Sequence, residues 1–566
     1  MTEKKLKSEG STRRSFLAKA TGGAAAVAAA PMMVTKVAEA KGRGRGRGHG
    51  VFQSIKRIKE AFNVRQKAAF IQKLVSLRKG PQRDNGDEAR YENDNYYASF
   101  TKTLPHDRFG EADPRAFEEL VRAMKTERQR DFDAISLDRR ADRLLANPQG
   151  ALKFIMSGLD SHATRMKAAP AFRSAKAAAE LGEVYWLALT RDVPFSEYNS
   201  DGMIGMAIDD LNGFSQTVGP KSGGVITADT LFRGATTGDL TGPYITQFLW
   251  KNVPYGPSLI EQRYNVPLAG VDFMTTRRNW LNVQRGGAPV ETLAVEADKR
   301  YIYNNRALGE YVHTDVLFQA YFNACFIALG YGGAALDDGN PYKSQISNQG
   351  GFTSFGGPFI IDLVCKAGNL ALTGAWYHKW SIHRRLRPEA MAGRVHFHLK
   401  GRRNYELHRD ILNSKAVDEV RAKNGGTYFL PMAFTEGSPT HPSYPAGHAT
   451  VAGACTTVLK ACFNESFVIP DPVVANNDGS ALDPYSGPDL TLGGEFNKLA
   501  NNISLGRDAA GVHYRTDGED GLLVGEQQAI AMLQDATLTT NEGGSFTLTK
   551  FDGTKIRIEN GKVRKI

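Results

Sequence analysis

The sequence predicts a mainly α-helical protein with long ordered loops and a small β-structure at its C-terminal end. From 199 to 300 the chain is rich in glycine, proline and aromatic residues, so we expect loops and short helices there. The tail over 541–566 alternates apolar and polar residues, which predicts a β-hairpin. Apolar residues at helical spacing fill several other segments: 51–79, 114–124, 175–192, 308–330, 358–383, the residues after His448, and 494–506.

Local residue choices justify these elements in turn. Between 51 and 79, lysine and arginine separate the apolar residues, which predicts one or two amphipathic helices. Pro114 lies near the first turn of the next helix, where proline is tolerated. Pro388 should end the helix over 358–383, because proline cannot continue a helix. Asp552-Gly553 and Asn560-Gly561 are the residue pairs that tight hairpin turns favour.

Composition places the chain among ordinary globular proteins. It has 566 residues, of which 41% are apolar and 23% charged, and this length suggests two to four structural units. The net charge is +11, but residues 1–40 and 41–50 contribute +4 each. A basic, nucleic-acid-binding body is therefore not indicated. There is no run of 18 apolar residues, so we expect no membrane-spanning helix.

Four cysteines are present: Cys325, Cys365, Cys455 and Cys462. None forms a C-x-x-C pair, so a zinc ribbon or a thioredoxin-like site is not supported. We expect buried, small apolar side chains. One or two disulfides are the alternative in an oxidising compartment.

The first 40 residues resemble a twin-arginine export signal. Arg13 and Arg14 precede a weakly hydrophobic stretch, and Ala38-Glu39-Ala40 has the pattern of a cleavage site. Such a signal exports a folded protein to a bacterial periplasm or beyond it; the alternative is a disordered alanine-rich tail. Residues 41–50 alternate arginine and glycine, so we expect a flexible tract, followed by N-terminal helices up to residue 95.

Two clusters of residues later in the chain could bind one anion. The segment 378–390 places Lys379 and Arg387 among residues that look buried. The stretch "HPSYPAGHATVAGAC" begins a helix at Gly447, where free N–H groups attract anions and a ligand can approach the backbone closely. His448 would stand beside that ligand, able to donate or remove a proton near neutral pH.

A third cluster holds Arg507 and His513. They are six positions apart in sequence, so in an unbroken helix they would lie on different faces. Gly511 allows the backbone to break between them. On its own this pattern is weak, but with the other two clusters it supplies three cations, a helix start and two imidazoles for a tetrahedral anion.

In this order and spacing, the three motifs resemble those of the vanadium haloperoxidases and their relatives, the type-2 phosphatidic acid phosphatases and class A acid phosphatases. Seven residues separate Lys379 from Arg387, as in the marine algal bromoperoxidases, against six in the usual phosphatase motif. The membrane spans of the lipid phosphatases are missing. The similarity to the algal enzymes covers roughly residues 90–540 and includes four further segments: 99–111, 238–249, 308–324 and 512–518.

The resemblance implies a role for each motif residue. His513 would be the ligand that binds vanadium. Lys379, Arg387 and Arg507 would hydrogen-bond the equatorial oxygens of vanadate, and Lys379 would also polarise bound peroxide.

Four more residues take their roles from the same resemblance. The Gly447 amide would donate to the oxyanion, and His448 would be the acid–base group facing the apical oxygen. By position, Asp315 would hold Arg507 in place. His441 stands where the algal bromoperoxidases carry a second active-site histidine, which favours bromide; a turn histidine without a halide role is the alternative.

One residue departs from the family pattern. Most members have serine before the Gly-His pair, and here that residue is Ala446. The missing hydroxyl removes one hydrogen bond to an equatorial oxygen, worth about 1.5–3 kcal/mol for a charged acceptor.

The resemblance also implies the larger organisation. We expect a helix-bundle vanadium haloperoxidase domain over 96–540, with its oxyanion-binding core at about 305–535. We expect one vanadate per subunit, with structural calcium as a further family cofactor, and a homo-oligomer. Hydrogen peroxide and halide would give hypohalous acid, which halogenates small organic acceptors. No nucleic-acid or membrane partner is expected.

Two other functions remain open at this point. A secreted acid phosphatase of the same superfamily would use His513 as nucleophile and His448 as the acid for the leaving group. A non-enzymatic polyanion-binding protein would instead act through the Arg-Gly tract at 41–50.

Overall fold

The computed structural model describes residues 49–78 and 80–566, and the chain forms two compact units, Met1–Lys73 and Leu74–Ile566. The predicted export signal and most of the Arg-Gly tract lie outside the described residues. The amphipathic segment after them is one continuous helix, α2 (His49–Leu77). All other elements belong to the second unit.

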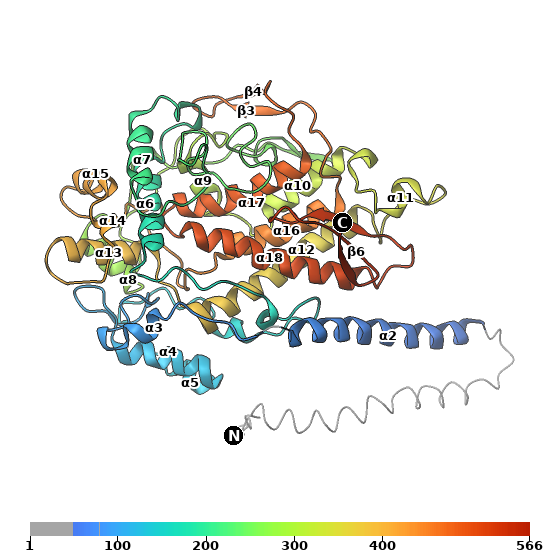
Figure 1. Cartoon of the computed structure of the whole chain (residues 1–566), viewed down its shortest axis with the longest axis horizontal. Helices are drawn as coiled ribbons and strands as arrows, with labels where there is room; N and C mark the ends of the chain where they lie inside the picture. The colour runs from blue at the N-terminus through green and yellow to red at the C-terminus, as the bar shows by residue number, and fades with distance from the viewer. Residues whose placement is uncertain (1–48, 79) are drawn as a thin grey trace, which may run out of the picture. The chain divides into compact units, whose positions relative to one another are not determined.

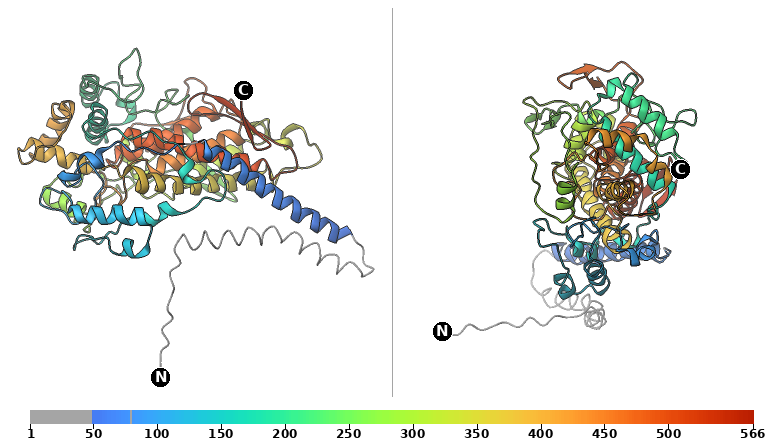
Figure 2. Two further views of the ribbon diagram at one scale, coloured as in Figure 1. Left: turned by 60° about the horizontal axis from the view of Figure 1, so that its bottom comes forward. Right: turned by 90° about the vertical axis from the view of Figure 1, so that its left-hand side faces the viewer.

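Four long helices run through the second unit: α12 (Gly357–Tyr377), α16 (Gly447–Cys462), α17 (Leu492–Ala509) and α18 (Arg515–Ala536) (Figure 1). α16 packs against the other three, and the views in Figure 2 show the same helices in the interior. Apart from His448, every residue of α16 is buried. A helix that is buried all round needs no polar face, which explains its run of small and apolar residues.

Glycines let α16 and α18 approach closely. A Cβ at Gly453 would lie 2.2 Å from the Leu522 carbonyl oxygen, and one at Gly525 would lie 2.0 Å from that of Thr450. Both positions therefore exclude any larger residue unless the helices separate.

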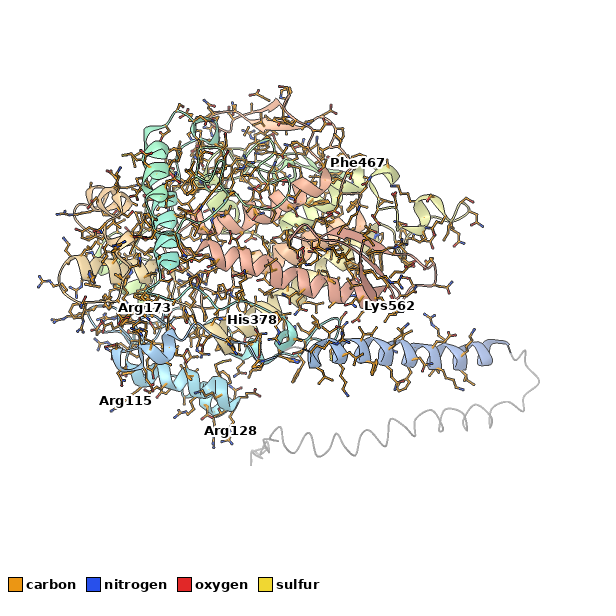
Figure 3. All side chains as sticks on the ribbon, viewed as in Figure 1. Arg115, Arg128, Arg173, His378, Phe467 and Lys562 are labelled. Carbon is orange, nitrogen blue, oxygen red and sulfur yellow. The ribbon has the colours of Figure 1, made fainter. Side chains whose placement is uncertain are left out.

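α12 passes into a π-helical segment, His378–His383, whose first residue is labelled in Figure 3. Among the described residues, Gly357–His383 is the one helical stretch long and apolar enough to cross a membrane, and half of its most apolar window is buried inside the protein. The prediction that Pro388 ends this helix is wrong. Arg384, in the left-handed conformation, ends it, and Pro388 is the first residue of α13 (Pro388–Leu399).

The predicted helix over 308–330 is also interrupted. α9 (Asn305–Tyr311) and α10 (Gln319–Gly330) are separate, and residues 312–318 form a loop between them. The loop matters because it carries Asp315.

The remaining helices surround the bundle and are mostly short. α4 (Pro114–Thr126) begins as predicted at Pro114, with the Asp113 side chain capping its N-terminus. The other α-helices are α3 (Asp87–Arg90), α5 (Gln129–Asp133), α6 (Ala175–Thr190), α7 (Gly202–Asn212), α8 (Arg277–Gln284), α11 (Pro341–Ser344), α14 (Arg409–Leu412) and α15 (Lys415–Lys423). Within 49–78 and 80–566 there are also six 3₁₀ turns: Glu92–Asp94, Pro148–Leu152, Ser161–Ala163, Phe195–Glu197, Gln247–Leu249 and Gly333–Ala335.

The strands form small antiparallel sheets. β1 (Val253–Tyr255) pairs with β2 (Ser258–Ile260), and β3 (Val473–Ala475) pairs with β4 (Leu482–Pro484). At the C-terminus, β5 (Phe546–Thr549), β6 (Lys555–Glu559) and β7 (Lys562–Lys565) form a meander. The small β-structure predicted around the Asp552-Gly553 and Asn560-Gly561 turns is therefore present as a three-stranded meander.

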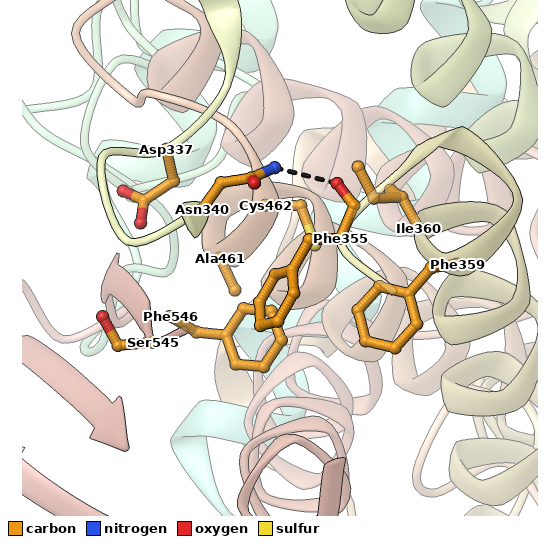
Figure 4. Close-up of a pocket in the computed structure, with 9 residues that line it drawn as sticks. All are labelled: Asp337, Asn340, Phe355, Phe359, Ile360, Ala461, Cys462, Ser545 and Phe546. Carbon is orange, nitrogen blue, oxygen red and sulfur yellow. Dashed lines mark hydrogen bonds between the residues drawn. The ribbon is translucent and has the colours of Figure 1, made fainter. Parts of the chain in front are cut away.

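The C-terminal sheet packs on the bundle through aromatic rings. Phe355 lies 5.9 Å from Phe546 of β5 and 5.5 Å from Phe359 of α12, between ring centroids. Figure 4 shows these rings around a small hollow, with the Asn340 side chain donating to the Phe355 carbonyl at 2.9 Å. None of the predicted site residues lines this hollow.

All four cysteines are free thiols. Three are buried and Cys365 is half-buried, so the expectation of buried apolar side chains is confirmed and the disulfide alternative is not.

Candidate active site

The three basic clusters meet at the N-terminus of α16. Lys379 lies in the π-helical segment and Arg387 is the N-cap of α13. Arg507 lies in the last turn of α17. Gly511, with φ of +83°, interrupts the helical conformation before His513, as the sequence predicts. The pKa of His513 responds to Lys379, Arg387 and Arg507 together, which places the three cations around one imidazole.

Lys379 is fully buried and points at the loop before α16. Its Nζ donates to the carbonyl oxygens of Pro442 at 2.7 Å and Ser443 at 2.8 Å. An ammonium group has three donors, so one remains for a ligand. A π-helical turn is a frequent device for aiming a functional side chain.

Arg387 connects two histidines. Its Nη1 lies 2.9 Å from Nε2 of His513, and its Nη2 lies 3.0 Å from Nδ1 of His441. Further bonds run to the carbonyls of His441 and Val512. The guanidinium is therefore held by loops from both sides of the site.

The neighbouring arginines of this basic run serve the fold instead. Arg384 forms an ion pair with Glu88, and Arg385 forms ion pairs with Glu180 and Asp517. Only Lys379 and Arg387 of the cluster are left for an anion.

Arg507 is buried and incompletely bonded. Its Nη1 donates to the Val312 carbonyl at 2.5 Å, while its Nε has no partner among the described residues. Buried polar groups are rarely left unpaired, and such a group indicates a missing partner. An oxyanion would supply it.

His513 is oriented by a carboxylate. Its Nδ1 lies 2.9 Å from Oδ2 of Asp517, which can only accept, so Nδ1 carries the proton. Burial, followed by the nearby Arg387 and Lys379, lowers the pKa of His513 well below its ordinary value. The ring is therefore neutral, with the lone pair on Nε2 facing the cations. This carboxylate–histidine pair is the arrangement that fixes a metal-binding imidazole.

Asp517 is a site residue that the sequence analysis missed. It also accepts from the Ser443 hydroxyl and from the backbone N–H of Tyr514, so it joins the loop before α16 to the start of α18. The available signal was a carboxylate four residues after His513, at the third position of a helix.

The expected role of Asp315 needs correction. Asp315 was predicted to hold Arg507, but its Oδ1 lies 3.0 Å from Nε2 of His448. Arg507 acts on Asp315 through its charge alone. That charge lowers the pKa of Asp315, but by less than the bond to His448 does. Burial first, and then Arg507, lowers the pKa of His448, although Asp315 opposes this. His448 is thus a neutral base near pH 7, with a fixed ring orientation.

The first turn of α16 supplies unpaired donors. Residues 447–449 have no intrahelical acceptor for their N–H groups, and Ala446 makes no side-chain cap. A Cβ at Gly447 would meet Leu372 at 3.5 Å and Trp376 at 3.6 Å, which are ordinary contacts. The fold alone therefore does not require glycine here, whereas a ligand touching the backbone would.

His441 lies at the edge of the site. Its Nδ1 lies 3.0 Å from Nη2 of Arg387 and 3.1 Å from the Pro442 carbonyl oxygen. Its ring is 4.8 Å from that of Trp376, a second neighbour that the sequence analysis did not single out for the site. A buried imidazole and an indole together make an apolar wall beside the cations.

The charges of the site fit an anion. Burial lowers the pKa of Arg387 to about 9 and that of Arg507 to about 10, and burial together with both arginines lowers that of Lys379 well below its usual value. Three cations held against one another in a buried site repel, and a bound oxyanion would relieve this repulsion. Among the described residues no cluster of three His, Cys, Asp or Glu side chains could hold a metal cation, so the structure locates no calcium site.

Comparisons with known proteins agree with this geometry. Residues 363–542 match the family model of the VCPO second helical-bundle domain. The vanadium-dependent bromoperoxidase of Corallina pilulifera is 34% identical over 89% of this chain and 98% of its own length. That of Ascophyllum nodosum is 35% identical over 81% of this chain and 86% of its own. The chain belongs to the vanadium haloperoxidase family.

The fold comparison extends over most of this haloperoxidase. The homohexameric structure of the second vanadate-dependent bromoperoxidase of Ascophyllum nodosum superposes with a TM-score of 0.84 at 31% identity, covering 90% of this chain and 93% of that one. The predicted helix-bundle haloperoxidase fold is therefore confirmed. Membership of the family implies a vanadate cofactor, and vanadate is a tetrahedral oxyanion of the kind that the three cations and the α16 N-terminus fit.

Proposed function

We propose that this haloperoxidase oxidises bromide with hydrogen peroxide to hypobromous acid, with one vanadate per subunit held by His513. The observation that carries the proposal is the paired arrangement at His513: Asp517 fixes its Nδ1, and Nε2 faces Arg387 among three buried cations. When bound there, vanadate would supply a Lewis-acidic centre that makes peroxide electrophilic toward halide.

Each protein group has a task in this reaction. Lys379, Arg387 and Arg507 neutralise the oxyanion, and the Gly447 amide adds a neutral donor from the helix start. Lys379 has a free donor for the incoming peroxide.

His448 handles the proton. It is neutral, and Asp315 orients its ring, so it can accept a proton from hydrogen peroxide and return one to the departing oxygen. Of its two ring nitrogens, Nε2 is engaged with Asp315, which leaves Nδ1 for the exchange.

Bromide as the preferred halide rests on His441 and on the relatives. The Corallina and Ascophyllum proteins are vanadium-dependent bromoperoxidases. In this chain, the buried His441 ring and the half-buried Trp376 ring offer a polarisable wall beside Arg387, suited to a large, weakly hydrated anion. The hypobromous acid would then halogenate small organic acceptors.

The deciding experiment uses purified apo-protein. We expect bromination of monochlorodimedone to appear only after vanadate is added, and to be faster with bromide than with chloride. Release of phosphate from a phosphomonoester without vanadate, in a preparation that never brominates, would show a phosphatase with His513 as nucleophile instead. The same preparation tested with iodide completes the halide series.

Location and assembly are part of the proposal. The twin-arginine motif supports export of the folded protein to a periplasm or beyond. The homohexameric neighbour supports a homo-oligomer. Light scattering of the purified protein, and fractionation of cells expressing it with Arg13 and Arg14 changed to lysine, test these two points. A monomer, or unchanged export of the variant, would contradict them.

A further inference from the structure

The loop 312–318 between α9 and α10 carries two contacts to the active site. The Val312 carbonyl accepts from Arg507, and Asp315 binds His448. The loop is only partly covered by the bundle: Val312 is fully buried, whereas Val316 is 67% exposed. The core therefore holds Val312, and the part of the loop around Asp315 needs a further anchor.

His313 is the anchor that the structure provides. Its Nδ1 lies 3.1 Å from Oε2 of Glu310, and its Nε2 lies 2.8 Å from Oε1 of Glu436. A carboxylate can only accept, so both bonds form only when both ring nitrogens carry hydrogen. His313 is therefore an imidazolium that ties the loop to α9 and to the segment before His441.

The same ring reaches Arg507 through an aromatic side chain. His313 stacks on Phe434 with centroids 3.7 Å apart and planes 9° from parallel, and the Arg507 guanidinium carbon lies 5.5 Å from the Phe434 centroid. Because the imidazole fills one face of Phe434 at contact distance, the guanidinium has to approach from another side. Movement of His313 would therefore change the packing of Phe434 beneath Arg507.

Glu436 interacts with both His313 and Arg507. It bonds His313 directly, and its charge also acts on Arg507. Without the imidazolium, Glu436 would be free to attract Arg507 away from the oxyanion. Arg143 is the other cation that acts on Glu436, and its Nη1 donates to the Glu436 carbonyl.

We propose that His313 is a positioning residue, which keeps Arg507 and the Asp315–His448 pair in the geometry that binds and turns over the oxyanion. The inference rests on the proposed vanadate site. It adds a group that touches neither vanadate nor substrate and acts only through Val312, Phe434 and Glu436.

The charge of His313 gives this role a pH signature. Burial disfavours the imidazolium, but the bonds to Glu310 and Glu436 outweigh it and raise the pKa of His313 to about 9. A raised pKa means that the pair of bonds from His313 to Glu310 and Glu436 is fully formed below the ordinary value near 6.5. The pair is lost as pH rises through about 9. The other charged groups that face it are Glu310, Glu436 and, through Phe434, Arg507.

The test compares vanadate affinity of wild type and His313→Gln at several pH values. Equilibrium dialysis of apo-protein, with vanadium analysis, gives the dissociation constant without an activity assay. We expect His313→Gln to bind about tenfold more weakly at pH 7, the scale of losses from groups that orient metal ligands. The ratio of the two constants should fall toward one above pH 9. Using the ratio removes the change in the protonation of free vanadate.

Two further variants make the result decisive. His162→Gln is the matched control, because His162 pairs with Asp160 at the surface and is not part of the site; its ratio should be one at every pH. Glu310→Gln removes one carboxylate from His313, so its loss of affinity should begin at lower pH than in wild type.

Equal affinity of His313→Gln and wild type at pH 7 would overturn the inference. A ratio that stays at tenfold above pH 9 would also overturn it, because it would show a role independent of charge. If His313→Gln does not fold, the pH at which Glu310→Gln loses affinity decides alone, and an unchanged value contradicts the inference. Wild-type protein that binds no vanadate would refute the proposed function instead.

Discussion

Restoring the family serine by Ala446→Ser should tighten vanadate binding. Ala446 is the N-cap of α16, with φ −67° and ψ 125°, and has no hydroxyl to cap the helix. Its backbone N–H is held by the Asp517 carbonyl at 2.8 Å, so the substitution should leave the chain in place. The new hydroxyl then has two possible partners, the free N–H groups of the first helical turn and the oxyanion.

The magnitude follows from the difference between these two uses. In apo-protein a serine N-cap stabilises a helix by about 1 kcal/mol over alanine. A hydrogen bond to a charged acceptor is worth about 1.5–3 kcal/mol. If binding exchanges the first for the second, the net gain is about 0.5–2 kcal/mol, which corresponds to an affinity roughly 2- to 30-fold higher.

Equilibrium dialysis of apo-protein measures this affinity, and thermal unfolding of the apo-protein measures the cap. Ala446→Val is the control for side-chain volume, because it adds bulk without a hydroxyl. We expect Ala446→Ser to gain both apo stability and vanadate affinity, and Ala446→Val to gain neither. An Ala446→Ser protein that is more stable but binds vanadate no more tightly than wild type would refute the reasoning, since the hydroxyl would then serve the helix alone.

Three other predictions follow from the site and the core. His513→Ala should fold, as judged by circular dichroism, but retain no vanadium after gel filtration; unchanged vanadium content would refute His513 as the ligand. Asp315→Asn should move the acid limb of bromide kcat/KM to lower pH, because the Asp315 carboxylate raises the pKa of His448 and its loss leaves burial and Arg507 unopposed; a limb at the wild-type pH would exclude His448 as the base. Reaction of native protein with a thiol reagent should modify Cys365 at most, and unfolded protein should yield all four thiols, since the other three are buried and none is paired; fewer thiols after unfolding would indicate a disulfide.

Much of the site could be predicted from sequence because its motifs are local. Gly447 and His448 share one helix start, and Gly511 provides the break that frees His513 from α17. The spacing of Lys379 and Arg387 survives as well, although Pro388 begins a helix where it was expected to end one. In each case the backbone within a few residues decides the outcome.

What could not be predicted depends on contacts between distant segments. The partner of Asp315 is set by the loop between α9 and α10, and the helical pattern over 308–330 hides that loop. Asp517 gains its role only when the start of α18 meets the loop before α16. Likewise, no sequence pattern distinguishes the roles of Arg385 and Arg387. Arg385 forms an ion pair with Glu180, whereas Arg387 contacts His513.

The most direct test of the account is a crystal structure of the protein with vanadate, using anomalous scattering to locate vanadium. We predict one vanadium per chain, bonded to Nε2 of His513, with its oxygens contacted by Lys379, Arg387, Arg507 and the Gly447 amide. Vanadium bound elsewhere, or bound in this pocket without a bond to His513, would contradict the account.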